Sequence, residues 1–224
     1  MSKRTIQLEK RKRKRESWHD EIEKRESKAE DLAAKVMADP RLLPQTLGAI
    51  SSARARTRLK SAKILRIISE KNPKMLCPRV GFFVDLLDSE NNILKWIAID
   101  VLANLTPVDS KNRFDEIFRK YYGYLGDESM ITAAHVIDSS GKIALAKPRL
   151  RSRITTELLR VETIPRGQEC KNILLGKVIL AFSQYVDQVR KKEKMISSAR
   201  RQLNNSRNAT RRKAEKFLRR FEKR

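Results

Sequence analysis

The chain has 224 residues, of which 40% are apolar, and it contains only seven glycines and seven prolines. This composition excludes a disordered polymer, provides enough apolar side chains for a core, and favours helices. Lysine and arginine number 51 against 27 acidic residues, a formal net charge of +24, which favours a polyanionic partner such as nucleic acid, an anionic membrane surface or an acidic protein.

The cysteines and the N-terminal sequence bear on location. Cys77 and Cys170 are far apart in sequence and form no C-x-x-C motif, so no disulfide framework is expected. No secretory signal is visible, and no apolar run approaches the roughly 20 residues that span a bilayer. We therefore expect a cytoplasmic protein without membrane insertion, or a nuclear one in a eukaryotic cell if the basic run at 10–15 acts as an import signal.

Residues 1–26 predict a basic polar arm, helical or disordered. The run KRKRKR at 10–15 has no apolar side chain to pack and is interpreted as a solvated helix or frayed tail, with a nucleic-acid-binding arm as the sharper alternative. The folded region is expected over residues 27–224. Ser27 and Glu30 have the spacing of a capping box at a helix start, and Asp39-Pro40 ends that helix.

From residue 40 onward the chain alternates two kinds of helix. The second helix of each pair is expected near 57–65, 94–102, 129–137, 171–179 and 210–218. These stretches align on one position that is small in four of the five copies, and an apolar pair follows three and four residues later. The aligned residues are Ser61, Ala98, Ala133, Leu175 and Ala214. Leu175 breaks the small-residue rule, so the fourth copy is the weakest.

Each second helix is preceded by another amphipathic stretch, which completes a helix-turn-helix unit of about 40 residues repeated five times. The apolar residues that mark the five first helices are Leu43, Leu47 and Ile50; Val80, Phe83, Leu86 and Leu87; Phe114, Ile117, Tyr121, Tyr124 and Leu125; Ile154, Leu158 and Leu159; and Ile196, Ala199 and Leu203.

Residues 78–105, PRVGFFVDLLDSENNILKWIAIDVLANL, resemble a HEAT repeat. The matching positions are an opening proline, an apolar pair before an Asp turn, an apolar–basic pair, a small residue and a second apolar pair, here Pro78, Leu86, Leu87, Asp88, Leu94, Lys95, Ala98, Val101 and Leu102. The resemblance covers about residues 40–224. It implies an all-α fold, an α-solenoid of about five HEAT-like repeats in an ARM-like superhelix, and a surface that binds other proteins.

The terminal stretch 209–224 predicts a capping helix for this solenoid. Its apolar stripe is Ala214, Phe217, Leu218 and Phe221, which we expect to pack on the two preceding helices. A cap needs a polar outer face but not a positive one. Residues 186–224 nevertheless carry 15 basic and 4 acidic groups, a net charge of +11, and residues 41–71 carry 8 and 1, a net charge of +7.

This uneven charge predicts a basic concave surface for a polyanion or an acidic partner. Phosphate contacts need cations at reachable spacing rather than exact geometry. The candidate binding residues are Arg58, Lys63, Arg66, Lys177, Arg211, Arg212, Lys216, Arg219 and Arg220.

No enzyme motif is present in the sequence. The seven glycines form neither G-x-G-x-x-G nor a P-loop, and the two histidines form no H-E-x-x-H, so no catalytic residue, cofactor or metal is expected. Trp96, Asp100 and His135 are candidate groups of the concave face, and HEAT-like DNA glycosylases place aromatic and acidic residues in such a cleft. The preferred interpretation is structural: Trp96 fills a gap between repeats, and Asp100 pairs with a neighbouring basic residue.

The sequence thus predicts a non-catalytic scaffold or adaptor that binds a macromolecule, most readily another protein, and an acidic protein would exploit the same positive charges. Sequence-independent nucleic-acid binding is the alternative, and a glycosylase-like enzyme is a third hypothesis. The oligomeric state is left open.

Overall fold

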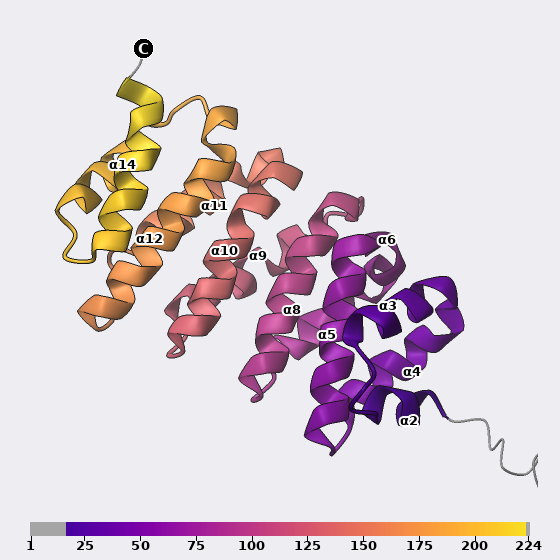
Figure 1. Cartoon of the computed structure of the whole chain (residues 1–224). Helices are drawn as coiled ribbons and strands as arrows, with labels where there is room; N and C mark the ends of the chain where they lie inside the picture. The colour runs from indigo at the N-terminus through magenta and orange to yellow at the C-terminus, as the bar shows by residue number, and fades with distance from the viewer. Residues whose placement is uncertain (1–16, 223–224) are drawn as a thin grey trace, which may run out of the picture. The chain divides into compact units, whose positions relative to one another are not determined.

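The computed structural model describes residues 17–222, so the basic run at 10–15 lies outside the described residues. Every regular element within 17–222 is helical, which confirms the expected all-α class for this part of the chain (Figure 1). The helices are α2 (Trp18–Glu23), α3 (Ala29–Ala38), α4 (Leu43–Gly48), α5 (Ala55–Lys71), α6 (Pro73–Leu76), α7 (Val80–Leu86), α8 (Asn92–Leu105), α9 (Arg113–Gly123), α10 (Met130–Ala146), α11 (Arg151–Arg160), α12 (Gln168–Tyr185), α13 (Glu193–Arg201) and α14 (Asn208–Glu222), with short 3-10 turns between many of them.

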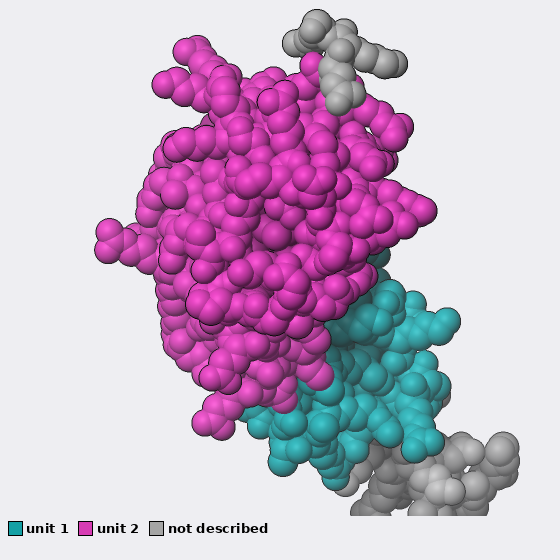
Figure 2. Space-filling model, turned by 90° about the vertical axis from the view of Figure 1, so that its left-hand side faces the viewer, with its two compact units in different colours: residues 1–75 teal, residues 76–224 magenta. Residues whose placement is uncertain are grey.

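The chain divides into two compact units, residues 1–75 and 76–224, which Figure 2 distinguishes by colour. In the first unit α2, α3 and α4 each pack against α5. In the second unit the second helices α8, α10, α12 and α14 contact one another in chain order and form one layer (Figure 1). Helices α7, α11 and α13 contact members of that layer, so each repeat buries its apolar stripe against a neighbour.

The aligned small position lies at helix contacts in every copy. Ser61, Ala98, Ala133 and Ala214 are fully buried, and the apolar pair that follows each of them is buried as well. In the fourth copy Leu175 is also buried, but the close approach is made one residue later, at Gly176. A Cβ atom on Gly176 would lie 2.8 Å from Oγ1 of Thr210 in α14, so this glycine takes the part that the small residue has elsewhere.

The first helices follow the expected pattern except in two copies. In α9, Phe118 and Tyr122 are buried beside the expected Phe114 and Tyr121, which widens the aromatic stripe. In the fifth copy the expected stripe is wrong by one residue.

Met195 and Ala199 are buried in α13, whereas Ile196 is only half-buried and Leu203 is 40% exposed. The physical reason is that α13 ends at Arg201, and the 3-10 turn that follows buries Gln202, whose side chain accepts a hydrogen bond from Asn205 at 2.9 Å.

Packed structure is already present before Ser27. Helix α2 begins with a capping box formed by Ser17 and Asp20, and it buries Trp18 and Ile22. Trp18 Nε1 donates a hydrogen bond to Thr46 Oγ1 at 2.8 Å. Residues 17–26 therefore belong to the packed first unit, and the polar arm remains a proposal for the residues before Ser17.

The capping box expected at Ser27 and Glu30 is wrong. In the described start of α3 the N-cap residue is Lys28, which makes no side-chain cap hydrogen bond. Glu30 instead forms an ion pair with Lys63 of α5 at 3.0 Å, because a charged partner across the helix contact competes with the backbone amide. Asp39 ends α3 as expected.

Ion pairs join consecutive repeats of the second unit, and most of them run in one direction. The acidic residue lies in the earlier repeat and the basic residue in the later one. The pairs of this kind are Asp88–Lys120, Asp109–Lys147, Asp115–Arg149, Asp138–Lys177, Glu162–Arg201, Glu169–Arg207 and Asp187–Arg220. Lys95–Asp127, at 3.3 Å, runs the other way. We call the seven pairs the inter-repeat ion pairs.

The pair Asp109–Lys147 is the buried member of this set. Its two charged atoms lie 3.0 Å apart, and their side chains are 8% and 6% exposed. Lys147 Nζ also donates to the backbone oxygen of Asp109 at 2.7 Å, and the Asp109 carboxylate accepts from the N–H groups of Arg113 and Phe114, each at 3.0 Å. One side chain thereby fixes both the turn after α8 and the start of α9.

Asp109 is expected to make the folded state acid-sensitive. Burial alone would raise the pKa of this carboxyl, but the hydrogen bonds from Phe114, Lys147 and Arg113 hold its pKa below the ordinary value. The stabilisation is therefore complete above about pH 4 and is lost as the pH falls through the lowered folded-state pKa. In urea unfolding, Asp109→Asn should cost about 2 kcal/mol at neutral pH, and the difference from wild type should shrink below about pH 4. A difference that stays constant into strong acid would contradict this role.

Because the small position lies in a helix contact, a long side chain there should strongly destabilise the fold. Replacing the fully buried Ala98 by arginine should lower the free energy of unfolding by several kcal/mol, because an unpaired charge and extra volume would enter a helix contact. The matched control is Ala34→Arg on the exposed side of α3, which should act within about 0.5 kcal/mol. Equal melting temperatures for the two variants would show that the repeat register is wrong.

Candidate functional site

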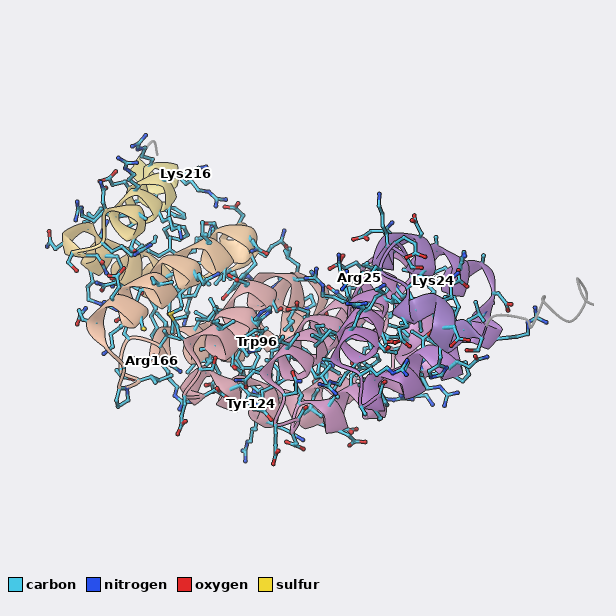
Figure 3. The ribbon with its side chains drawn as sticks, turned by 60° about the horizontal axis from the view of Figure 1, so that its bottom comes forward. Lys24, Arg25, Trp96, Tyr124, Arg166 and Lys216 are labelled. Carbon is cyan, nitrogen blue, oxygen red and sulfur yellow. The ribbon has the colours of Figure 1, made fainter. Side chains whose placement is uncertain are left out.

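One stripe of exposed and half-buried side chains runs along each second helix of the second unit. In α10, α12 and α14 its residues recur at i, i+4 and i+7, which places them on one side of each helix. Together with two residues of α8 they form what we call the second-helix face: Trp96 and Asp100 of α8; Ile131, His135 and Asp138 of α10; Ile173, Lys177 and Leu180 of α12; and Arg212, Lys216 and Arg219 of α14. Figure 3 labels Trp96 on α8 and Lys216 on α14.

The structure brings Trp96, Asp100 and His135 together between α8 and α10. The rings of Trp96 and His135 stack with centroids 5.5 Å apart and an interplanar angle of 12°. His135 Nδ1 lies at hydrogen-bond distance, 2.9 Å, from Asp100 Oδ1, and Trp96 Nε1 donates to Thr132 Oγ1 at 2.9 Å. The indole N–H, the carboxylate and one imidazole nitrogen thus each bind a group of the neighbouring helix.

Three of the candidate cations in this unit are held by the fold. Lys177 pairs with Asp138 at 2.5 Å. Arg220 donates to the backbone oxygen of Ser183 at 2.9 Å and pairs with Asp187. The remaining member of this group, Arg211, caps a turn: its guanidinium donates to the backbone oxygens of Asn205 and Ser206 at 2.7 and 3.1 Å. Lys177 thus links α12 to α10, Arg220 links α14 to the preceding repeat, and Arg211 holds the turn before α14.

The other three candidates of α14 have a different setting. Arg212, Lys216 and Arg219 are exposed, and among the described side chains, those of residues 17–221, none of them makes an ion pair or a hydrogen bond. Three positive charges on one side of one helix repel one another in the isolated chain. They are the cations of the second-helix face that are available to a partner.

The candidates of the first unit already have interaction partners. Arg58 is half-buried and its Nη1 donates to the backbone oxygen of Ser52 at 2.8 Å. Lys63 pairs with Glu30, and Arg66 is half-buried and has an interaction partner. This group therefore contributes less available charge than its sequence suggests.

Sequence reasoning missed Lys213, which lies next to the buried Ala214. Its ammonium is half-buried, and its pKa is lowered by burial and by the nearby charges of Lys177 and Arg207. The signal was present in the alignment, since Lys213 and Lys60 occupy the position before the small residue in their copies. The pKa of Lys60 is likewise lowered by burial and by Arg56.

Two further properties limit what the described residues can do. Within residues 17–222 no group of three or more His, Cys, Asp or Glu side chains is placed to hold a metal ion. No described helix is both long enough and apolar enough to cross a membrane.

Comparison with known proteins identifies the fold. The structure is similar to a designed armadillo repeat protein, YIII(Dq)4CqI, with a TM-score of 0.56 and 12% sequence identity, over 85% of this chain and 86% of the designed chain. No protein-family model matches the chain, and no curated protein matches it. The likeness confirms an all-α, armadillo-like solenoid and, at this identity, concerns the fold alone.

The contacts of Asp100 lead to a prediction that separates a structural from an enzymatic role. With a structural role, Asp100→Asn should lower the free energy of unfolding by about 1 kcal/mol, because His135 loses a charged partner. Neither wild type nor variant should then release bases from alkylated DNA. The control is Asp85→Asn at an exposed carboxylate of α7. Base release by the wild type, abolished in an Asp100→Asn variant of unchanged stability, would establish the enzymatic role instead.

Proposed function

We propose that this armadillo-like solenoid is a non-catalytic scaffold whose second-helix face binds an acidic segment of a partner protein. The observation that supports this proposal is the set Arg212, Lys216 and Arg219, three exposed cations for which the described side chains provide no ion pair. A solubilising cap needs charge of either sign. A uniformly positive stripe favours a partner that brings carboxylates.

Exposed aliphatic side chains on the same face favour a protein partner. Ile131 and Leu180 are 45% and 43% exposed, and Ile173, on the same stripe of α12 as Leu180, is half-buried. Completing the burial of one such side chain contributes on the order of 1 kcal/mol, and each rim ion pair adds roughly 0.2–1 kcal/mol. We therefore infer that aliphatic contacts supply most of the affinity and that the cations supply selectivity and association rate.

Sequence-independent nucleic-acid binding is the second candidate, and the formal net charge of +24 favours it. Exposed cations suffice for phosphate contacts. Single-strand binding would also need aromatic side chains for stacking, but Trp96 of the second-helix face is already stacked on His135. Duplex DNA is therefore the appropriate competitor in a binding test.

The proposal predicts the behaviour of a variant with three charges removed. Arg212→Gln, Lys216→Gln and Arg219→Gln together should weaken binding of a labelled peptide of alternating glutamate and leucine roughly tenfold, at about 0.5 kcal/mol per lost ion pair. Fluorescence anisotropy measures the affinity. The melting temperature should be nearly unchanged, because exposed substitutions act within about 0.5 kcal/mol each.

The matched control removes the same charge elsewhere. Lys111→Gln, Arg119→Gln and Arg200→Gln alter exposed cations outside the second-helix face and should leave peptide affinity within about twofold of wild type. Equal losses in the two triple variants would show that only net charge matters. Tighter binding of duplex DNA than of peptide, with a salt slope that falls by roughly 0.9 per lost contact in the first variant, would support the nucleic-acid alternative.

A further inference from the structure

The contact between α12 and α14 contains a cluster of cations that the fold itself does not neutralise. Lys213 of α14 reaches across to α12 at Gly176, where a Cβ atom would meet the Cδ and Nζ atoms of Lys213, each at 3.4 Å. Thr210 is the residue that requires the glycine, since its Oγ1 would lie 2.8 Å from that Cβ atom, whereas Lys213 lies at ordinary van der Waals distance. The ammonium of Lys213 is therefore held against α12 beside Lys177, the next residue of that helix.

The acids around this cluster are already committed. Asp138 pairs with Lys177 at 2.5 Å, and Glu169 pairs with Arg207. Lys213 has no ion pair and no hydrogen-bond acceptor among residues 17–222. Three cations thus share two carboxylates, and the cation left over is the half-buried one.

This arrangement is unfavourable in the isolated chain. A half-buried ammonium gives up part of its hydration, and here it gains no acceptor while two cations lie close to it. Burial first, and then the charges of Lys177 and Arg207, lower the pKa of Lys213, and the smaller opposing effect comes from Asp138, which is already paired with Lys177. An oxyanion at this position would supply the missing acceptor and reduce the repulsion.

We infer that Lys213, together with Lys177 and Arg207, forms an oxyanion-binding site at the α12–α14 contact that receives a carboxylate of the acidic partner segment. The inference rests on the proposed function, because Lys177 and Lys216 connect this site to the second-helix face. Lys216 lies three residues beyond Lys213 and is exposed, so one acidic segment can contact both. A carboxylate is favoured over a phosphate by the aliphatic side chains Ile173 and Leu180 on the neighbouring stripe of α12.

The test is Lys213→Met in the full chain, which keeps the length of the side chain and removes its charge. The variant should melt about 2 °C or more above wild type in the absence of ligand, because the repulsion is gone. It should bind the glutamate–leucine peptide roughly tenfold more weakly. Acetate at constant ionic strength should raise the melting temperature of wild type but not of the variant.

The controls separate this site from the wider surface. Lys216→Met removes an exposed cation of the same helix. It should lower the affinity for the peptide without raising the melting temperature. If Lys213→Met keeps full affinity for the peptide and an undiminished response to acetate, the proposed oxyanion site is wrong. The proposed function is then still tested separately, by the variant in which Arg212, Lys216 and Arg219 are all replaced by Gln. If instead that triple variant keeps full affinity and Lys213→Met loses it, the site stands and the proposed surface is wrong.

Two measurements on wild type complete the test. In nuclear magnetic resonance spectra of the lysine side chains, the chemical shift of the Lys213 ammonium should change as the peptide is added. This measurement uses wild-type protein, so it does not depend on the folding of a variant. A Lys213 signal that does not move at saturating peptide overturns the site. Stabilisation by inorganic phosphate but not by acetate at equal ionic strength would overturn the carboxylate assignment and point to a phosphate-bearing partner.

Discussion

The structure depends on the contact between consecutive repeats, because a two-helix unit cannot bury its apolar stripe alone. In the second unit this contact combines small or glycine residues, which let helices approach, with inter-repeat ion pairs. The two parts have different magnitudes. Burying a leucine or phenylalanine contributes about 1.5–3 kcal/mol, whereas an exposed ion pair contributes about 0–1 kcal/mol. Apolar packing therefore provides the stability. The ion pairs, with an acid in the earlier repeat and a base in the later one, specify how one repeat follows another.

This direction of pairing has a consequence for charge at the last repeat. Its arginines Arg201, Arg207 and Arg220 are neutralised by acids of the preceding repeat. The position that is Asp138 in α10 is Leu180 in α12 and Arg219 in α14. The second-helix face thus ends in cations that no part of the described chain offsets, and we propose that a partner does so.

The fold was predictable from sequence because it rests on a periodic requirement. A helix contact demands a small residue and an apolar pair at fixed spacing, and those positions are buried in all five copies. Asp100 and His135 each lie two residues after the small position of their copy, and Asp100 Oδ1 lies 2.9 Å from His135 Nδ1. What could not be predicted depends on partners far apart in sequence. Periodicity assigned Arg211 and Arg220 to an open basic face, yet both are held by the preceding turn and repeat. The alignment places Lys213 and Lys60 before the small position of their copies, but it could not show the setting of Lys213, which depends on Gly176 in another helix.

The measurement that tests the pairing of repeats most directly is a double-mutant cycle on Asp109 and Lys147. Free energies of unfolding in urea would be compared for wild type, Asp109→Asn, Lys147→Met and the double variant at neutral pH. Because the pair is buried and joins one repeat to the next, each single change leaves a partner without compensation. We predict a coupling free energy of about 2 kcal/mol or more, with the double variant more stable than additivity allows. Additive effects, with a coupling near zero, would contradict the claim that these ion pairs link the repeats.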